Sequence, residues 1–224
     1  MKLATQTVVS SLAAFLVFLA LVFLPAGTFG YWQGWLFIAL LVIASAGPAT
    51  YLGLKDPAAL QRRMRGGPLK ESRSAQKIAS SGTLLSLPAA IVISALDHRF
   101  GWSTVPVGIS VLGDILVLVG VGVGFVVIIQ NSYAAANITV EADQKVVSTG
   151  LYGLVRHPMY VGMLIFQAGT PLALGSYWGL SVLILAVVVF AFRILDEERF
   201  LKQELAGYVD YSRDVQYRLV PYVW

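Results

Sequence analysis

Two short stretches of the sequence contain the side chains that could perform chemistry. The first is Leu151–Gly162, in which a cation and an imidazole, Arg156 and His157, directly precede Pro158. Proline is favoured at the first position of a helix, because its missing N–H would have no partner there in any case. The free backbone N–H groups of a helix start attract negative groups. We therefore predict that Arg156 and His157 lie at the positive end of a helix, where an anionic ligand group could bind.

The second stretch ends the last apolar segment of the chain and contains three consecutive acids within Arg193–Arg199. Arg193 and Glu197 are four residues apart, so they share one face of a helix. Such pairs contribute little on exposed helices, but charged groups at the edge of a membrane span are costly to place. Arginine, imidazole and carboxylates together would suit a ligand that has both a carboxylate and an ammonium group.

Both stretches also have a purely structural interpretation. Arg156 could mark a membrane boundary, His157 could be a buried interface residue, and the acids could belong to a solvated helix end. The two interpretations can be distinguished, because only a functional site requires the two stretches to lie close together in space.

The composition is that of an integral membrane protein. Hydrophobic residues make up 57% of the chain and charged residues only 12%, and the mean hydropathy is +0.74. The absence of cysteine excludes disulfides, thiolate catalysis and cysteine-based metal sites. Two histidines are too few for a histidine metal cluster, so no metal site is predicted.

Six apolar runs have about the length that a helix needs to cross a bilayer. They cover approximately residues 8–24, 32–54, 78–96, 105–129, 158–174 and 179–194. We predict an all-α fold, a polytopic integral membrane helical bundle with about six membrane helices. A signal peptide is the alternative for the first run, but a second run follows it at once. Residues 1–224 then form a single membrane domain, with four helices in 1–130 and a core that contains both reactive stretches in 131–224.

The basic residues are distributed as the positive-inside rule demands. With six crossings, fifteen of the 16 Lys and Arg residues fall on one side, and Arg99 alone falls on the other. This pattern indicates topology rather than nucleic-acid binding, and it places both termini and both reactive stretches in the cytoplasm. Residues 55–77 hold seven of these basic residues. We interpret them as a solvated, membrane-adjacent loop with a short surface helix around Pro57–Met64.

The fourth run contains two further features. Gly120 and Gly124 have the Gly-x-x-x-Gly spacing that lets membrane helices approach closely. Asp114 is a carboxylate within the same run, where charge is costly. It either faces a cavity or lies near the membrane surface.

The fifth and sixth runs are joined by a very short segment, 175–178. Such a short connection predicts an antiparallel helical hairpin. The start of the fifth run and the end of the sixth then lie at the same cytoplasmic end. His157 is therefore expected to meet the face that holds Arg193 and Glu197.

These residues resemble a known family of membrane enzymes. Val146–Tyr152, followed by Arg156-His157-Pro158-Met159-Tyr160-Val161-Gly162, is similar to the core of the isoprenylcysteine carboxyl methyltransferases. The same signature recurs in related phospholipid methyltransferases. The resemblance continues through Arg193 and the Glu197-Glu198 pair to Tyr208–Val215, and so covers about the last hundred residues. The combination of both halves is specific, whereas either half alone would be weak.

The resemblance implies S-adenosylmethionine-dependent methyl transfer to a lipophilic acceptor that enters from the bilayer. The protein would then contact membrane lipids, and it would not bind nucleic acid. Arg193 and Glu197 would be the catalytic residues near the acceptor, and Glu198 or Glu197 would bind the ammonium group of the cofactor. The cofactor-binding residues would be Val147, Gly150, Tyr152, Arg156, His157, Tyr160 and Glu198.

The sequence leaves the acceptor open. A carboxylate acceptor needs no general base, and Arg193 would position it, whereas an amine acceptor would need Glu197 as a base. Residues 131–140 are rich in alanine and lack the polar, histidine-bearing character of the family at this loop. The alternatives are an NADPH-dependent sterol or enone reductase of related fold, which would need more basic residues to bind phosphate, and a non-catalytic membrane protein. Nothing in the sequence indicates an oligomeric state.

Overall fold

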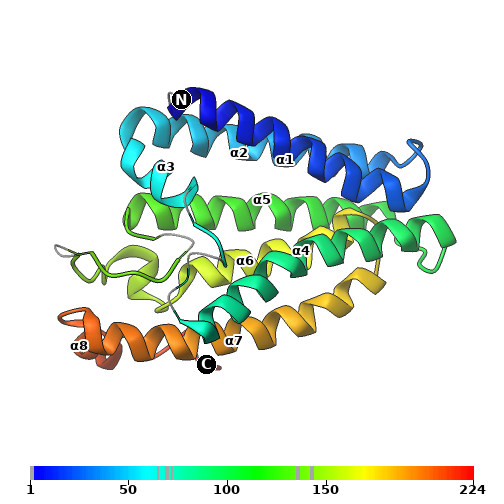
Figure 1. The fold of residues 1–224 in the computed structure, drawn as a ribbon. Coiled ribbons are helices and arrows are strands. Elements are labelled where there is room, and N and C mark those ends of the chain that lie inside the picture. Colours follow the sequence, from blue (N-terminus) through cyan, green and yellow to red (C-terminus); the bar gives the residue numbers. More distant parts are fainter. Residues whose placement is uncertain (1–2, 65, 69–70, 72, 135–136, 142–143) are drawn as a thin grey trace.

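The computed structural model describes residues 3–64, 66–68, 71, 73–134, 137–141 and 144–224, and they form a bundle of helices (Figure 1). These described residues contain no strand, so the prediction of an all-α fold is confirmed. The short surface helix is present with the predicted bounds. The elements are α1 (Leu3–Ala26), α2 (Trp32–Lys55), α3 (Pro57–Met64), α4 (Ser74–Phe100), α5 (Val107–Gln130), η2 (Gly150–Gly153), α6 (Pro158–Ala173), η3 (Trp178–Leu180), α7 (Ser181–Glu204) and α8 (Tyr208–Asp214).

Within the described part of the chain, five helices are long and apolar enough to cross a membrane, namely α1, α2, α4, α5 and α7. The prediction of a polytopic helical membrane protein is thereby confirmed. The sixth predicted crossing is α6, which has only 16 residues. It is shorter than the about 20 residues that a bilayer-spanning helix usually needs.

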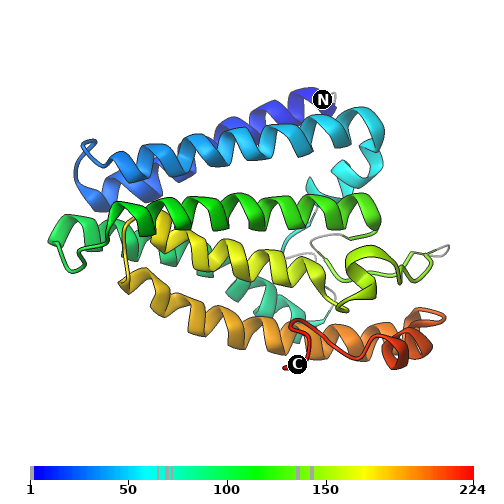
Figure 2. The same cartoon turned by 180° about the vertical axis from the view of Figure 1, so that it is seen from behind.

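The helices are arranged around α5, which lies between α2 and α6 in both views (Figures 1 and 2). The α1–α2 hairpin lies on one side of α5. Helix α7 lies on the other side of the bundle, beyond α6. Helix α1 begins and α7 ends at the same end of the bundle. The α3 helix, α8 and the start of α6 lie at this end too, so segments far apart in sequence gather there.

Helices α5 and α6 pack closely because glycines face the contact. A Cβ atom at Gly113 would overlap the backbone of Ala173, and one at Gly120 would lie 2.7 Å from the Gly162 carbonyl oxygen. The predicted role of Gly120 is therefore confirmed. Gly124 differs, because its nearest neighbour is a methionine sulfur 3.9 Å away. The close approach depends on Gly113 and Gly120, seven residues apart, and it sets how α6 lies against α5.

Replacing Gly113 with valine is expected to separate α5 from α6. The new side chain would meet rigid backbone that cannot move aside, and overpacking of this kind costs about 1–3 kcal/mol or more. We expect a clear fall in the thermal unfolding midpoint of the detergent-purified protein. The matched control is Gly122→Val on the same helix, where a Cβ atom would meet nothing within 4 Å. Equal midpoints for the two variants would contradict this account of the packing.

The far end of the hairpin is fixed by the buried carboxylate of Asp97, near the end of α4. Its Oδ2 accepts hydrogen bonds from the Ser103 hydroxyl and the Ser176 hydroxyl, each at 2.6 Å. The Ser176 hydroxyl in turn accepts a bond from the Gly179 N–H at 3.0 Å. These contacts hold the turn between α6 and α7 against α4, so the hairpin is anchored opposite the end where its polar residues lie.

Candidate active site

Helix α6 starts at Pro158, as predicted, with proline at its first turn. The two residues before it are held by the C-terminal segment. The Arg156 N–H donates to the Tyr217 carbonyl oxygen at 2.9 Å, and the His157 N–H donates to the Arg218 carbonyl oxygen at 3.0 Å. The backbone thus presents both side chains toward α7, which lies alongside.

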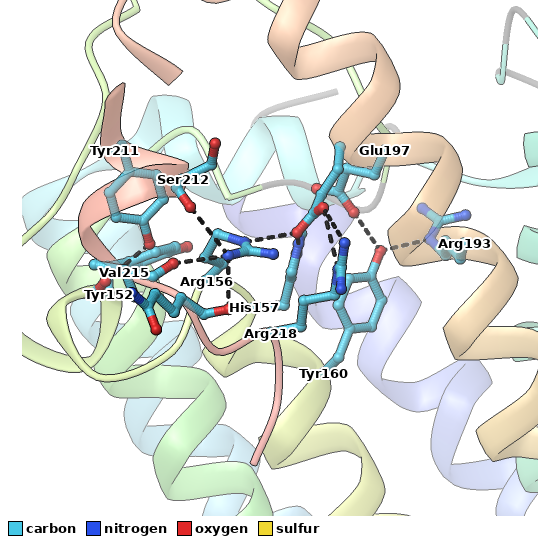
Figure 3. A network of polar contacts seen from close by, with 12 residues as sticks. Tyr152, Arg156, His157, Tyr160, Arg193, Glu197, Tyr211, Ser212, Val215 and Arg218 are labelled. Atoms are coloured by element: carbon cyan, nitrogen blue, oxygen red, sulfur yellow. Dashed lines mark hydrogen bonds and ion pairs between the residues drawn. The ribbon is translucent and has the colours of Figure 1, made fainter. Parts of the chain in front are cut away.

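Glu198 of α7 is the centre of a buried ionic cluster at this end of the bundle. Figure 3 shows its partners Arg156, His157 and Arg218. Its side chain is only 3% exposed. One oxygen accepts a bond from Arg156 Nε at 2.7 Å and lies 3.3 Å from His157 Nε2. The other oxygen accepts a bond from Arg218 Nε at 3.1 Å. A carboxylate buried to this degree is tolerated because both oxygens are paired with cations.

Arg156 is also bound to the C-terminal segment through its other nitrogens. Its Nη1 donates to the Val215 carbonyl oxygen at 2.7 Å and to the Gln216 carbonyl oxygen at 2.9 Å. The guanidinium therefore joins three parts of the chain: the start of α6, the end of α7 and the segment after α8. Residues that are up to 60 positions apart are fixed relative to one another by this one side chain.

Tyr160, in the first turn of α6, lies between Arg193 and Glu197 (Figure 3). Arg193 Nε donates to the tyrosine hydroxyl at 2.8 Å, and this hydroxyl donates to Glu197 Oε2 at 2.8 Å. The sequence predicted that Arg193 and Glu197 share a helix face, and they do. The phenol of the neighbouring helix bridges them, so the pair and the α6 signature form one chain of hydrogen bonds.

Arg193 has further partners on its other side. Its Nη2 lies 3.1 Å from the carboxylate of Glu71, and its Nη1 donates to the Ser80 hydroxyl. The Ser80 hydroxyl donates to the same Glu71 oxygen at 2.8 Å. Glu71 is 4% exposed. The interpretation of residues 55–77 as wholly solvated was therefore wrong at Glu71, which the fold places inside the bundle.

A cavity of about 400 Å³ lies between the start of α6, α7 and the loops at this end. This is within the range that holds a small molecule or cofactor. Its lining includes polar and aromatic side chains as well as the apolar side chains of Leu84, Met159 and Met163. Leu84 is on an exposed face of the predicted membrane helix α4. The lining thus combines residues of the polar cluster with a residue on the apolar surface of the bundle.

Tyrosines outside the membrane helices line the polar part of the cavity. Burial raises the pKa of the Tyr152 hydroxyl to about 12, although a hydrogen bond from Asn131 opposes the shift. Burial also raises the pKa of Tyr208 well above its ordinary value. Both phenols therefore stay protonated at neutral pH. The buried Tyr208 hydroxyl has no hydrogen-bond partner among the residues that the structure describes, so it is available to a ligand.

The structure brings most of the predicted site residues to this cavity. Two lie outside its lining. Gly150 is an exposed turn residue with φ of +62°, where a Cβ atom would overlap the Gln130 side chain. Glu198 lies behind Arg156 and His157 and contacts both. The predicted residues that line the cavity are Val147, Tyr152, Arg156, His157, Tyr160, Arg193 and Glu197.

Three site residues were missed by sequence reasoning: Glu71, Ser80 and Arg218. Glu71 stands in a basic segment, and a lone glutamate among so many cations was the signal that could have drawn attention to it. Arg218 lies three residues beyond the stretch that resembles the family. Ser80 had no signal at all. Asp114, by contrast, is buried in α5 and takes no part in lining the cavity.

Comparisons with known proteins point to the same region of the chain. Residues 109–206 match the sequence profile of the phospholipid methyltransferase family. The protein-S-isoprenylcysteine O-methyltransferase B of Arabidopsis thaliana is 42% identical over 79 residues, which are 34% of this chain and 39% of that protein. The protein-S-isoprenylcysteine O-methyltransferase of Schizosaccharomyces pombe (strain 972 / ATCC 24843) is 40% identical over 62 residues, or 26% of this chain and 25% of that protein.

A third match is longer and more distant. The probable protein-S-isoprenylcysteine O-methyltransferase of Oryza sativa subsp. indica is 29% identical over 194 residues, which cover 82% of this chain and 93% of that protein. The chain thus spans nearly all of this relative, but it matches well under half the length of the Arabidopsis and Schizosaccharomyces proteins.

The fold and the site define a class of protein: a polytopic helical membrane protein with a cavity and a buried ionic cluster at one end of its bundle. The matches add a family resemblance to this class. Residues 109–206 match the phospholipid methyltransferase family, and the relatives that resemble the chain are protein-S-isoprenylcysteine O-methyltransferases. The resemblance predicted from the last hundred residues is confirmed.

Proposed function

We propose that this chain is an S-adenosylmethionine-dependent methyltransferase that acts on a lipophilic acceptor from the bilayer. The observation that supports this most strongly is the mixed lining of the cavity. It includes Arg156 and His157 as well as Leu84 and Met163. A charged donor and an apolar acceptor could therefore meet in one cavity.

The cavity residues fit the groups of this cofactor. Arg156 and His157 at the start of α6 would bind its carboxylate, which the helix N-terminus also favours. Glu197 would bind its ammonium group rather than Glu198, because Glu197 lines the cavity and Glu198 does not. The unpaired Tyr208 hydroxyl would donate to a polar atom of the adenosine.

The chemistry then requires little beyond positioning. S-adenosylmethionine supplies, when bound, a methyl group that its sulfonium has already activated. The apolar lining excludes water, and the fixed side chains hold the acceptor in line, which can contribute about 7–11 kcal/mol in ideal systems. Arg193 is the residue best placed to orient the acceptor, since Tyr160 holds it against α6 at 2.8 Å.

The acceptor that we propose is a carboxylate of the isoprenylcysteine type. Arg193 lines the cavity and can pair with a carboxylate, and the matched relatives carry this substrate in their names. A carboxylate oxygen would form the new bond to the methyl carbon, while the sulfur–methyl bond breaks and its electron pair stays on sulfur. No proton moves. An amine acceptor would instead have to lose a proton, and Glu197 would accept it.

Calorimetric titration of the detergent-purified protein tests the donor. We expect S-adenosylhomocysteine to bind and NADPH not to bind, and we expect His157→Ala to weaken S-adenosylhomocysteine binding at least tenfold. The matched control is His98→Ala, which removes the other histidine of the chain at the far end of α4. NADPH binding without S-adenosylhomocysteine binding would favour the reductase. Unchanged affinity in His157→Ala would remove His157 from the site.

The acceptor is tested with labelled methyl donor. We expect transfer to an N-acylated S-prenyl cysteine with a free carboxylate, and none to the corresponding carboxamide. Transfer to an amine lipid of a membrane extract, with no transfer to the prenyl cysteine, would support the phospholipid reaction instead.

We further propose that the polar end of the bundle and both termini are cytoplasmic. The basic residues support this orientation, and α1 begins at the same end of the bundle where α7 ends. A reporter fused after Trp224 should read as cytoplasmic, and one inserted after Trp102 should read as external. The reverse pattern would contradict the proposal.

A further inference from the structure

Glu71 has no place in the mechanism above, yet it contacts two residues that line the cavity. Its carboxylate lies 3.1 Å from Arg193 Nη2 and accepts a bond from the Ser80 hydroxyl at 2.8 Å. Arg193 and Ser80 both line the cavity, whereas Glu71 does not. Glu71 therefore lies behind the residue that would orient the acceptor.

Because Glu71 and Arg193 are both buried, their charges act strongly on a group that binds beside them. The Glu71 side chain is 2% exposed and that of Arg193 is 7% exposed, so water screens neither group well. An acceptor carboxylate that approaches Arg193 would be attracted by the guanidinium and repelled by the carboxylate behind it. The site consequently presents much less positive charge than an arginine alone would.

A smaller positive charge at the acceptor site would favour methyl transfer to a carboxylate. A carboxylate loses its negative charge as it takes up the methyl group, so strong pairing with arginine stabilises the substrate more than the transition state. Binding energy of that kind lowers KM and also lowers kcat. A partly neutralised arginine can orient the carboxylate without holding its charge too strongly.

We propose that Glu71 is a specificity-determining residue of the acceptor site, which sets how strongly the site binds a carboxylate relative to a neutral group of the same shape. The proposal rests on the function proposed above. It assigns to Glu71 a charge effect on the acceptor and no effect on the cofactor.

The test measures the affinity of two probes, an N-acylated S-prenyl cysteine and its carboxamide, for the detergent-purified protein. Glu71→Gln keeps the shape of the side chain and removes its charge. We expect the ratio of acid affinity to amide affinity to rise at least tenfold, while S-adenosylhomocysteine affinity stays within threefold. KM for the acid should fall, and kcat should fall with it.

Two variants serve as matched controls. Glu71→Asp keeps the charge and should keep the ratio within threefold of the wild-type value. Asp196→Asn removes a neighbouring carboxylate that pairs with Arg73 at 2.8 Å, and it should also leave the ratio unchanged. A merely structural Glu71 would instead weaken both probes and the cofactor together. That result, or an unchanged ratio in Glu71→Gln, would overturn the proposal.

A second variant covers the case in which Glu71→Gln does not fold with Arg193 left unpaired. Glu71→Gln with Arg193→Gln removes both charges, which buried pairs tolerate far better than the loss of one. The double variant also lacks the guanidinium that orients the acceptor carboxylate, so its probe ratio is compared with that of Arg193→Gln alone. If the charge of Glu71 repels the acceptor carboxylate, the ratio should be higher in the double variant than in Arg193→Gln. Equal ratios in these two variants would overturn the proposal. If the wild-type protein binds S-adenosylhomocysteine but neither probe, the proposed acceptor itself is wrong, and this shows before any variant is made.

Discussion

Glu198→Gln is expected to give the largest loss of stability of any single substitution in the site. The substitution keeps the size of the side chain but removes its charge. Arg156 and Arg218 would then remain in place without the carboxylate that pairs with both. Breaking a buried ion pair by removing one partner costs about 3–5 kcal/mol. The thermal unfolding midpoint should fall sharply, and S-adenosylhomocysteine binding should become undetectable because Arg156 and His157 lose their fixed positions.

The matched control for this experiment is Glu204→Gln at the exposed end of the same helix. It makes the same chemical change outside the cluster, and it should leave both the midpoint and the affinity unchanged. If Glu198→Gln behaved like this control, the ionic cluster would contribute nothing to the site, and Arg156 would have to be positioned by its backbone contacts alone.

Arg193→Lys is expected to give the largest loss of activity in a protein that still binds its cofactor. Lysine keeps the charge beside Glu71 but loses the planar fork, which here reaches Tyr160, Ser80 and Glu71 at once. We expect methyl transfer to fall at least a hundredfold, about 2.7 kcal/mol of transition-state stabilisation. S-adenosylhomocysteine affinity should stay within about threefold, which calorimetry on the same sample measures.

Arg73→Lys is the matched control, because Arg73 is also ion-paired, with Asp196 at 2.8 Å, and does not line the cavity. It should retain near-normal transfer. Near-normal turnover in Arg193→Lys would reject positioning by the arginine fork. A loss of cofactor binding would instead move Arg193 into the donor pocket.

The features that follow from local sequence were predicted well. Proline at the first helical position defines the start of α6, and a short connection brings its start to the end of α7. Both depend on nearby residues only, so a single sequence suffices. The meeting of His157 with the carboxylates of α7 then follows from the hairpin, and the structure places His157 Nε2 3.3 Å from Glu198.

The polar partners across the bundle could not be predicted, because they depend on how distant segments pack. Asp196, for example, pairs with Arg73 from the segment before α4, more than a hundred residues away in sequence. Spacing suggested direct pairing of Arg193 with Glu197. It gave no sign that a phenol from α6 would lie between them.

The same limit applies to Glu71 and Arg218. Each lies more than fifteen residues from its charged partner in sequence, and no periodic pattern links the two positions. The Gly-x-x-x-Gly prediction was right for one glycine and not the other, because the crossing of α5 and α6 selects which residues face each other. The sequence predicted close packing of the helix that contains Gly120, but it did not predict which residues of α5 and α6 face each other.

The shortness of α6 bears on the depth at which the reaction would take place. At about 1.5 Å per residue, its 16 residues extend only about 24 Å, whereas the hydrocarbon layer is about 30 Å thick. The hydrophobic mismatch of about 6 Å is met either by local thinning of the bilayer or by a helix start that lies below the headgroups. In either case the start of α6 would lie close to the hydrocarbon layer, so a lipid acceptor would need to leave the bilayer only slightly to reach His157. The shortness of α6 would therefore lower the free energy needed to extract the acceptor from the membrane.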